Sequence, residues 1–397
     1  MLALATLTAC KKNVQGDQNV KAGILPDGSS LPLIIDSQVE LIANGTYYLD
    51  GRCYVKSGGE LKINAGVTVK CITKPSAPEA SILIICRGGK INADGTDGTI
   101  VFTSDNATPL VGDWGGIIIL GKAPVNKPNP FIQGLSNLPL GVDGQYGGTN
   151  AADNSGVLKY VRIEWAGAMI LDGNELNGLT LGGVGNGTVL DYIQVSYGQD
   201  DAFEFFGGTV NATHLISLNT NDDILDFDYG YTGNVQYVIG VRRPGFAYAD
   251  ANGIESDNDG SSSQDIPRTQ PNVSNVTLIG GETTPFNGTL NAARFRRATG
   301  INVTNSIFLG YGNGITLEHG ASGTFSGNII HAFSTLGPVP PGNETYVNGS
   351  NSNTDIQLID PFAVGASFDP GTTLPGHAGK GATPGFDYWY LGWTAGL

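Results

Sequence analysis

The central part of the chain, from Asn177 to Glu318, repeats itself about every 22 residues. Each repeat begins with Asn or Asp and continues into a short segment in which apolar residues alternate with others. The repeats begin at Asn177, Asp201, Asp223, Asn252, Asn291 and Asn313, so their spacings are 24, 22, 29, 39 and 22 residues. A regular spacing of about 22 residues, from which the other spacings differ only by being longer, is typical of stacked β-coils that carry loop insertions on one side. The pattern therefore predicts an all-β solenoid.

The alternation also predicts which side chains form the core. The third residue of each repeat is apolar and should point inward, as should most of the fifth residues. The third residues are Leu179, Phe203, Leu225, Ile254, Ala293 and Ile315. If the coils stack at about 4.8 Å, these residues form continuous apolar columns, and the initial Asn and Asp residues form a ladder at the turn.

Composition agrees with one elongated domain over residues 31–397. The chain of 397 residues contains 59 Gly and only 14% charged residues, which suits many tight corners and disfavours helices. Repeat proteins escape the usual size limit of a single core, because each coil contacts only its neighbours. The formal net charge of -15 disfavours nucleic acid as a partner. An extracellular glycan or a surface protein fits the composition better.

The outward positions of the repeat carry the candidate chemistry. The fourth position reads Thr180, Glu204, Asp226, Glu255, Arg294 and Thr316, and the sixth reads Gly182, Phe206, Asp228, Asp257, Arg296 and Glu318. Carboxylates stacked at about 5 Å repel one another unless a cation, a proton or an arginine intervenes. Calcium suits such a place because it takes several oxygen ligands.

Three interpretations of these columns stay open. The first is a calcium site made by Glu204, Asp226, Asp228, Glu255 and Asp257. The second is simple ion pairing, in which Arg294 and Arg296 neutralise the columns. The third is catalysis, for which Asp226, Glu255 and Arg294 are the candidates, because a glycoside hydrolase needs two carboxylates at a working separation.

Long insertions lie beside this face and are the expected recognition elements. Residues 121–155 are rich in Pro, Asn and Gly and predict a long loop that projects from the stack. Further loops lie within residues 242–288. There Arg242, Phe246 and Tyr248 are candidate ligand-binding residues, since the aromatic pair has the chemistry to stack on a sugar ring.

The two ends of the chain predict an anchor and a cap. Leu7-Thr8-Ala9-Cys10 closes an apolar run and resembles a lipobox, which predicts lipidation at Cys10, a flexible tether over residues 11–30 and attachment to a membrane through the lipid alone. The other cysteines, Cys53, Cys71 and Cys86, are interpreted as buried strand residues, with one disulfide among them as the alternative. Near the C-terminus, residues 371–397 include an aromatic segment that is expected to cap the open end of the stack.

A resemblance to a known family supports the fold. The periodicity, together with Gly112-Asp-Trp-Gly-Gly116, Leu181-Gly-Gly-Val-Gly185 and Asp226-Phe-Asp-Tyr-Gly230, resembles the right-handed parallel β-helix lipoproteins common in Bacteroidota. That resemblance implies a right-handed single-stranded helix and an outer-membrane, surface-exposed lipoprotein. It transfers no catalytic residue, because the family has no settled activity. The broader β-helix class includes pectate lyases, polygalacturonases, tailspikes and adhesins, so fold alone does not choose between binder and enzyme.

The functional expectation is therefore twofold. The first expectation is a surface-anchored binding, adhesion or scaffold module that binds a glycan and is stabilised by calcium. The alternative is a calcium-dependent polysaccharide lyase or a glycoside hydrolase that acts on acidic glycans.

Overall fold

The computed structural model describes most of the chain after the first 22 residues. The described residues are 23–75, 79–132, 134–135, 138–171, 174–243, 246, 248, 251–280, 291–347, 368, 379–384 and 387–397. The expected lipidation site Cys10 and the first part of the expected tether lie outside them. Within the described residues no helix is long and apolar enough to cross a membrane.

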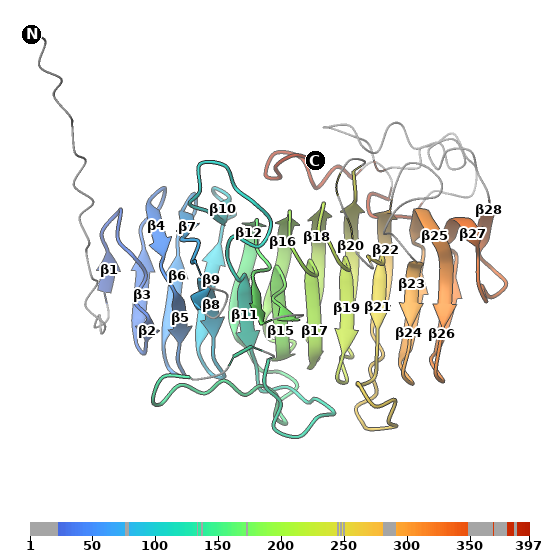
Figure 1. The fold of residues 1–397 in the computed structure, drawn as a ribbon, viewed down its shortest axis with the longest axis horizontal. Coiled ribbons are helices and arrows are strands. Elements are labelled where there is room, and N and C mark those ends of the chain that lie inside the picture. The colour runs from blue at the N-terminus through green and yellow to red at the C-terminus, as the bar shows by residue number, and fades with distance from the viewer. Residues whose placement is uncertain are drawn as a thin grey trace, which may run out of the picture.

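The described strands form one right-handed parallel β-helix. They build a single 26-stranded sheet in which every pairing is parallel, so each strand contacts the equivalent strands of the coils before and after it. Figure 1 shows the coils side by side in one elongated stack. The pairings define three walls, which we call A, B and C, around one apolar core. The predicted solenoid is confirmed.

The strands divide among the walls as follows. Wall A contains β2 (Ile34–Ile35), β5 (Arg52–Val55), β8 (Ile82–Ile85), β11 (Ile117–Leu120), β15 (Leu179–Val184), β17 (Phe203–Gly208), β19 (Leu225–Asp228), β21 (Ile254–Ser256), β23 (Asn291–Phe295) and the end of β25 (Ile307–Leu317). Wall B begins with β1 (Gly23–Leu25), β3 (Gln38–Leu41), β6 (Glu60–Ile63) and β9 (Lys90–Asp94), and ends with β24 (Gly300–Thr304) and β26 (Ser322–Ser326). Wall C begins with β4 (Thr46–Leu49), β7 (Thr68–Cys71) and β10 (Ile100–Ser104), and ends with the start of β25, β27 (Ile329–Thr335) and β28 (Glu344–Val347).

In the middle coils, single bent strands serve both wall B and wall C. These strands are β12 (Gly156–Glu164), β16 (Val189–Ser196), β18 (Ala212–Leu218), β20 (Asn234–Val241) and β22 (Asn272–Ile279). The bend in each strand is one residue with a left-handed backbone, at Tyr160, Tyr192, His214, Tyr237 and Asn275. Neighbouring rings of this column stack on one another, with centroids 4.3 Å apart for Tyr160 with Tyr192 and for Tyr192 with His214. The stacking compensates for a backbone region that non-glycine residues rarely adopt. A separate antiparallel pair, β13 (Met169–Leu171) and β14 (Asn174–Glu175), lies in the connection before β15.

Wall A has the register that the repeat predicts. Glu204 lies beside Thr180 on one neighbouring coil and beside Asp226 on the other, and Asp226 lies in turn beside Glu255. The inward column is fully buried, and Phe205 and Phe227 pack with ring centroids 5.2 Å apart. The expected buried thiols are also confirmed, since Cys53, Cys71 and Cys86 are free and buried.

Two segments lie elsewhere than the sequence predicted. The loop over residues 121–155 does not simply project, because Ile132, Leu135 and Tyr146 are buried against the outer face of wall A. The first strand, Gly23–Leu25, begins inside the expected tether and pairs with β3, so the folded body starts earlier than residue 31.

The described part of the C-terminal segment covers a side of the stack instead of its end. Trp389, Tyr390 and Trp393 pack against the outer side of wall C. The side-chain amide of the fully buried Gln194 holds the backbone of Ala395 through two hydrogen bonds, of 2.7 and 2.9 Å. In Figure 1 the C-terminus lies beside the middle coils.

Candidate functional site

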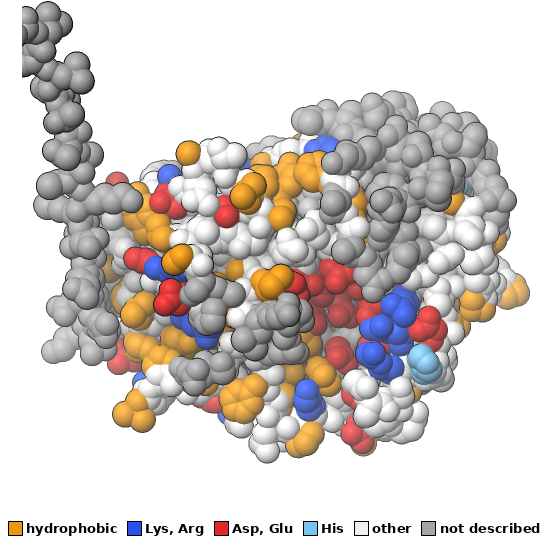
Figure 2. Space-filling view, in the orientation of Figure 1, with side chains coloured by type: hydrophobic (Ala, Val, Ile, Leu, Met, Phe, Trp, Pro, Cys, Tyr) orange, Lys and Arg blue, Asp and Glu red, His pale blue; other side chains and the backbone are white. Residues whose placement is uncertain are grey.

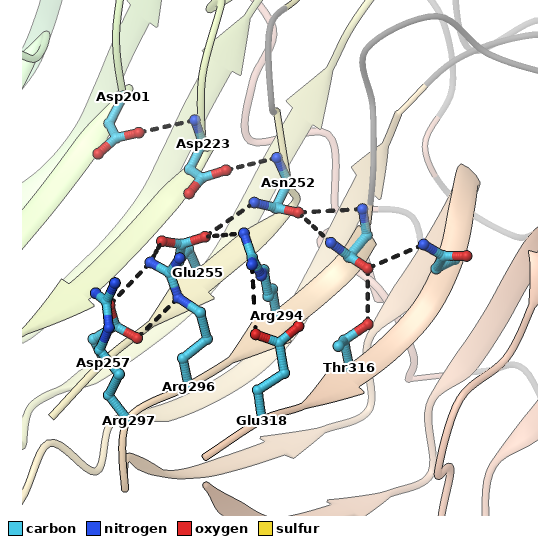
Figure 3. Close-up of polar contacts among 12 residues, drawn as sticks. Asp201, Asp223, Asn252, Glu255, Asp257, Arg294, Arg296, Arg297, Thr316 and Glu318 are labelled. Carbon is cyan, nitrogen blue, oxygen red and sulfur yellow. Dashed lines mark hydrogen bonds and ion pairs between the residues drawn. The ribbon is translucent and has the colours of Figure 1, made fainter. Parts of the chain in front are cut away.

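A ladder of side chains fixes the beginnings of β19, β21 and β23 in wall A. The backbone amide of Asp223 donates to Asp201 Oδ1 at 2.8 Å, and that of Asn252 donates to Asp223 Oδ1 at 2.6 Å. The next coil continues the ladder, since Asn291 donates to Asn252 Oδ1 through both its backbone and its side chain. Figure 3 shows Asp201, Asp223 and Asn252 in a row, joined by these hydrogen bonds. The ladder predicted from the repeat is confirmed, and it anchors the polar columns beside it.

At the C-terminal end of wall A the acidic residues are paired with arginines. Arg296 contacts both Glu255 and Asp257, and its Nη2 lies 2.9 Å from Asp257 Oδ2. Arg297 contacts the same carboxylate at 2.5 Å, and Arg294 lies between Glu255 at 3.7 Å and Glu318 at 3.4 Å. Figure 3 shows this network as one connected set. Glu255 and Asp257, expected among the metal ligands, are therefore neutralised by protein cations.

Two coils earlier, Asp201, Glu204 and Asp226 converge without an ion pair to any described Lys or Arg. Carboxylate oxygens of Asp201, Glu204 and Asp226 lie within 4.8 Å of one another. A second group, Asp200, Asp201 and Asp222, meets the same distance limit and shares Asp201 with the first. Glu204 and Asp226 belong to the outward column of fourth repeat positions in β17 and β19. The turns that precede these two strands supply Asp200, Asp201 and Asp222.

These carboxylates line a cleft of about 330 Å³ in the outer face of wall A. Its other lining residues are Ile132, Glu175, Leu176, Asn177 and Phe206, so the loop over 121–155 contributes one side through Ile132. Among the described residues that line the cleft, none is Lys or Arg. Figure 2 shows acidic side chains gathered in a hollow of this face, with a group of basic side chains next to it.

Burial and mutual repulsion raise the pKa values of carboxylates in and beside the cluster. Desolvation, followed by the charges of its acidic neighbours, raises the pKa of Glu204 and that of Asp226 well above their ordinary values. Burial, with Glu175 and Asp223 nearby, raises the pKa of Asp200 to about 6. Burial also raises the pKa of Asp228 to about 7. The site therefore favours either protons or a bound cation at neutral pH.

Two oxygen atoms of the site are buried without a hydrogen-bond partner. They are Asp226 Oδ1 and Asn177 Oδ1, and Asn177 as a whole is only 5% exposed. The Asn177 amide group meanwhile donates to Glu204 and, at 3.2 Å, to Thr180, which orients the side chain. Buried polar atoms normally have partners, so unsatisfied carbonyl and carboxylate oxygens beside an acidic cluster fit a hard cation such as Ca²⁺.

Asp228, expected as a further metal ligand, lies two residues after Asp226 on the same strand, β19. It accepts a hydrogen bond from the backbone amide of Tyr229 at 2.7 Å, and Lys127 lies 4.2 Å from the Tyr229 ring centre. Phe206, its neighbour across the coils, stacks on Tyr229 with centroids 5.7 Å apart. A half-buried aromatic surface thus adjoins the acidic cleft.

Two of the three candidate ligand-binding residues of the 242–288 loops, Arg242 and Tyr248, need correction. Arg242 is fully buried, and its guanidinium donates to backbone carbonyls, among them that of Asn252 at 2.9 Å. Tyr248 is also buried, and its hydroxyl donates to the Arg243 carbonyl at 2.9 Å. Both side chains organise the loop and are not exposed to a sugar ring. Phe246 is the one exposed member of the three, while residues 281–290 lie outside the described residues.

The sequence interpretation missed Asp200, Asp222 and Glu175 as members of the site. A signal was present, because the doublets Asp200-Asp201 and Asp222-Asp223 are 22 residues apart, which is the period of the repeat. In each doublet the second Asp belongs to the ladder, and the first turns its carboxylate into the cleft.

Comparison with known proteins agrees with this architecture. The family model described as a pectate-lyase-like β-helix domain matches residues 33–394, which is nearly the whole described body. A search of curated proteins finds no match.

Proposed function

Because the chain belongs to the pectate-lyase-like β-helix family, we propose that wall A binds a calcium ion and, through it, a carboxylate-bearing glycan. The observation that carries this proposal is the convergence of Asp201, Glu204 and Asp226 within 4.8 Å in a cleft. Carboxylates so close together are stable in ionised form only when a positive charge lies between them.

Calcium is the cation that fits the donors best. The site offers carboxylate oxygens and the free Asn177 Oδ1, and Ca²⁺ prefers six to eight oxygen ligands in a flexible arrangement. Zinc and copper prefer imidazole or thiolate ligands, and the residues that line the cleft include neither His nor Cys.

A uronate-type glycan matches the remainder of the site. A calcium ion in a cleft of about 330 Å³ has space on its open side for a ligand carboxylate, which would complete its coordination. Phe206 lines the same cleft and offers an apolar face to a sugar ring. The net charge of -15 then makes the ion the necessary link between an acidic protein and an acidic polymer.

The arrangement favours binding over catalysis. Of the three catalytic candidates, only Asp226 lies in the cleft, while Glu255 and Arg294 are engaged with each other and with neighbouring charges. A lyase needs a basic group near the sugar carbon that loses a proton. The described residues that line the cleft offer only carboxylates for that task, with no Lys, Arg or His, and a bound calcium ion would occupy these carboxylates.

We also propose that this binding module is anchored to the bacterial cell envelope, a location that suits a glycan receptor. The support is the lipobox-like sequence that ends at Cys10. Replacing Cys10 with Ala in the full-length protein should move it from the membrane fraction to the soluble fraction, and retention of the variant would contradict the anchor.

Polyuronate binding tests the proposed function. The protein should bind immobilised polygalacturonate or alginate in calcium and be released by a chelator. A Glu204→Gln, Asp226→Asn double variant should lose this binding, whereas the exposed pair Asp36→Asn, Asp97→Asn, which removes the same charge, should retain it. Equal binding by the two variants would refute the proposal. Release of unsaturated uronate products would instead assign the protein as a lyase.

A further inference from the structure

We infer that a second site, at the corner where wall A turns into wall B, binds an acidic sugar through its oxyanion group and without a metal ion. A pocket of about 470 Å³ lies there, and its lining includes Ser57, Arg87 and Lys122. Each of these residues comes two positions after a strand of wall A, namely β5, β8 and β11, which lie in neighbouring coils (Figure 1). The pocket shares no lining residue with the acidic cleft, so the two sites are separate.

A glycine brings two hydrogen-bond donors together from three successive coils. Gly88 has a left-handed backbone, with a φ of +82°, and lies between Ser57 of the coil before and Lys122 of the coil after. A Cβ atom at Gly88 would lie 2.7 Å from Ser57 Oγ and 2.7 Å from Lys122 Nζ. The missing side chain therefore leaves room for a hydroxyl and an ammonium group to face the same point of the pocket.

The loop over residues 121–155 forms the other side of the pocket, and Arg87 holds it in place. Arg87 Nε donates to Asp143 Oδ2 at 2.8 Å. The same guanidinium donates to the Gly147 carbonyl and to Gln145 Oε1, both at 3.1 Å. The loop also supplies backbone and polar side chains to the lining, at Gly148, Thr149 and Asn150. The wall of the pocket is thus fixed by contacts that need no ligand.

Lys122 supplies a positive charge that the loop does not neutralise. Among the described residues that line the pocket, Asp143 is the only acidic one, and it is paired with Arg87 at 2.7 Å. The backbone of Lys122 is fixed, because its amide donates to Asp153 Oδ2 at 3.0 Å and its carbonyl accepts from the Asn150 amide at 2.9 Å. Two cations and one carboxylate line the pocket, so its lining is positive in a chain whose formal net charge is -15.

These groups fit an oxyanion that is carried by a sugar. Lys122 offers a charged donor, and hydrogen bonds between charged groups are stronger than neutral ones. Ser57 and Thr149 add hydroxyl donors. The volume of about 470 Å³ lies in the range of small-molecule pockets and leaves space for the sugar ring beside its anionic group. A sulfate ester, a phosphate ester and a uronate carboxylate share this chemistry.

Four sugars that differ only at carbon 6 test the inference: galactose 6-sulfate, galactose 6-phosphate, galacturonate and galactose. Ligand-observed NMR titration of the wild-type protein, in buffer freed of metal ions by a chelating resin, should show binding of an acidic sugar and none of galactose. The acidic sugar that binds most tightly identifies the oxyanion. Binding should weaken as sodium chloride is added, because salt screens exposed charges.

Two variants of the pocket and one control locate the binding. Lys122→Gln should weaken it at least about tenfold, because the charged donor is lost. Ser57→Ala should weaken it about threefold and leaves the charge intact. Lys90→Gln removes the same charge from an exposed position on wall B and should bind as the wild type does. Because Ser57 and Lys122 are also exposed, all three variants should keep the melting temperature of the wild type.

The possible results separate this site from the acidic cleft. Absence of binding by every acidic sugar, equal binding of galactose, or equal effects of Lys122→Gln and Lys90→Gln would each overturn the inference. The Glu204→Gln, Asp226→Asn variant should bind the acidic sugar as tightly as the wild type, and a loss there would overturn it by placing the sugar in the cleft. Because this assay contains no calcium, its failure leaves the proposed function standing, and failure of calcium-dependent polyuronate binding leaves this site standing.

Discussion

The carboxylate of Asp201 accepts a hydrogen bond from the backbone amide of Asp223, one coil further along, at 2.8 Å. The same contact repeats between Asp223 and Asn252 and continues at Asn291, so one side chain in each coil holds the backbone of the next. The ladder therefore joins the coils independently of the sheet hydrogen bonds. It also positions Asp201 at the centre of the acidic cleft.

Removing one member of the ladder should weaken the stack. Asn252→Ala leaves the buried amides of Asn291 without their acceptor and removes the donor to Glu255 at 3.2 Å. We expect the free energy of unfolding to fall by about 2 to 3 kcal/mol, measured by urea denaturation. The matched control is Asn234→Ala in the exposed ladder of wall B, which should cost about 0.5 kcal/mol. Equal losses would contradict the role of burial.

The arginine network should be more sensitive to the shape of the side chain than to its charge. Arg296 donates to both Glu255 and Asp257, and Asp257 is only 5% exposed. Arg296→Gln removes the shared cation and leaves Asp257 with only Arg297 and Glu255 with only Arg294 as ion-pair partners, so we expect a loss of about 3 kcal/mol in unfolding free energy. Arg296→Lys retains the charge but lacks the forked donors and should recover only part of this loss. Full recovery by Lys would show that charge alone matters.

Protonation of the acidic cleft gives stability a characteristic dependence on pH. The folded pKa of Asp200 is raised to about 6 and that of Asp228 to about 7, both above the unfolded value near 4. The folded state therefore holds protons that the unfolded chain loses, and stability should decrease as pH rises from about 4 to about 7. Thermal unfolding in a chelator should show this slope, and Asp228→Asn should reduce it. Calcium should reduce it too, because the ion replaces the protons. A slope that is identical in wild type and Asp228→Asn would contradict this assignment.

The C-terminal segment should stabilise the middle coils and not the last one. Trp393 packs edge-on against Tyr160 and Tyr192, with centroids 5.7 and 6.0 Å away. Trp393→Ala should lower the unfolding free energy by about 3 kcal/mol. Hydrogen exchange should show the lost protection in β16 and β18, which lie beneath the segment. Loss of protection confined to β26 and β27 would instead indicate an end cap.

The sequence was sufficient to predict the register of wall A from β15 to β25. The positions of Leu179, Phe203 and Leu225 in one column follow from the period and the alternation alone, because each coil must bury its apolar face against the next. The same reasoning placed Glu204, Asp226 and Glu255 in one outward column, as the pairings confirm.

What periodicity does not encode is how the insertions fold back. The loop over 121–155 crosses wall A where Gly182 provides room, since a Cβ atom there would lie 2.7 Å from the Tyr146 ring. The burial of Arg242 likewise depends on backbone carbonyls from other coils. The sequence did indicate that the outer side of wall C is covered by another segment. Leu215 and Ile216 are consecutive apolar residues, as expected for a strand that is buried on both faces.

The central claim is that the acidic cleft is completed by a cation, and unfolding in calcium and in a chelator at pH 7 tests it most directly. Because only the folded chain assembles Asp201, Glu204 and Asp226, calcium at 100 times its dissociation constant should add about 2.7 kcal/mol for a single site. We predict a clear rise in melting temperature for the wild type and for Asp36→Asn, Asp97→Asn, and none for Glu204→Gln, Asp226→Asn. A wild-type melting temperature that is the same in calcium and in the chelator would contradict the account.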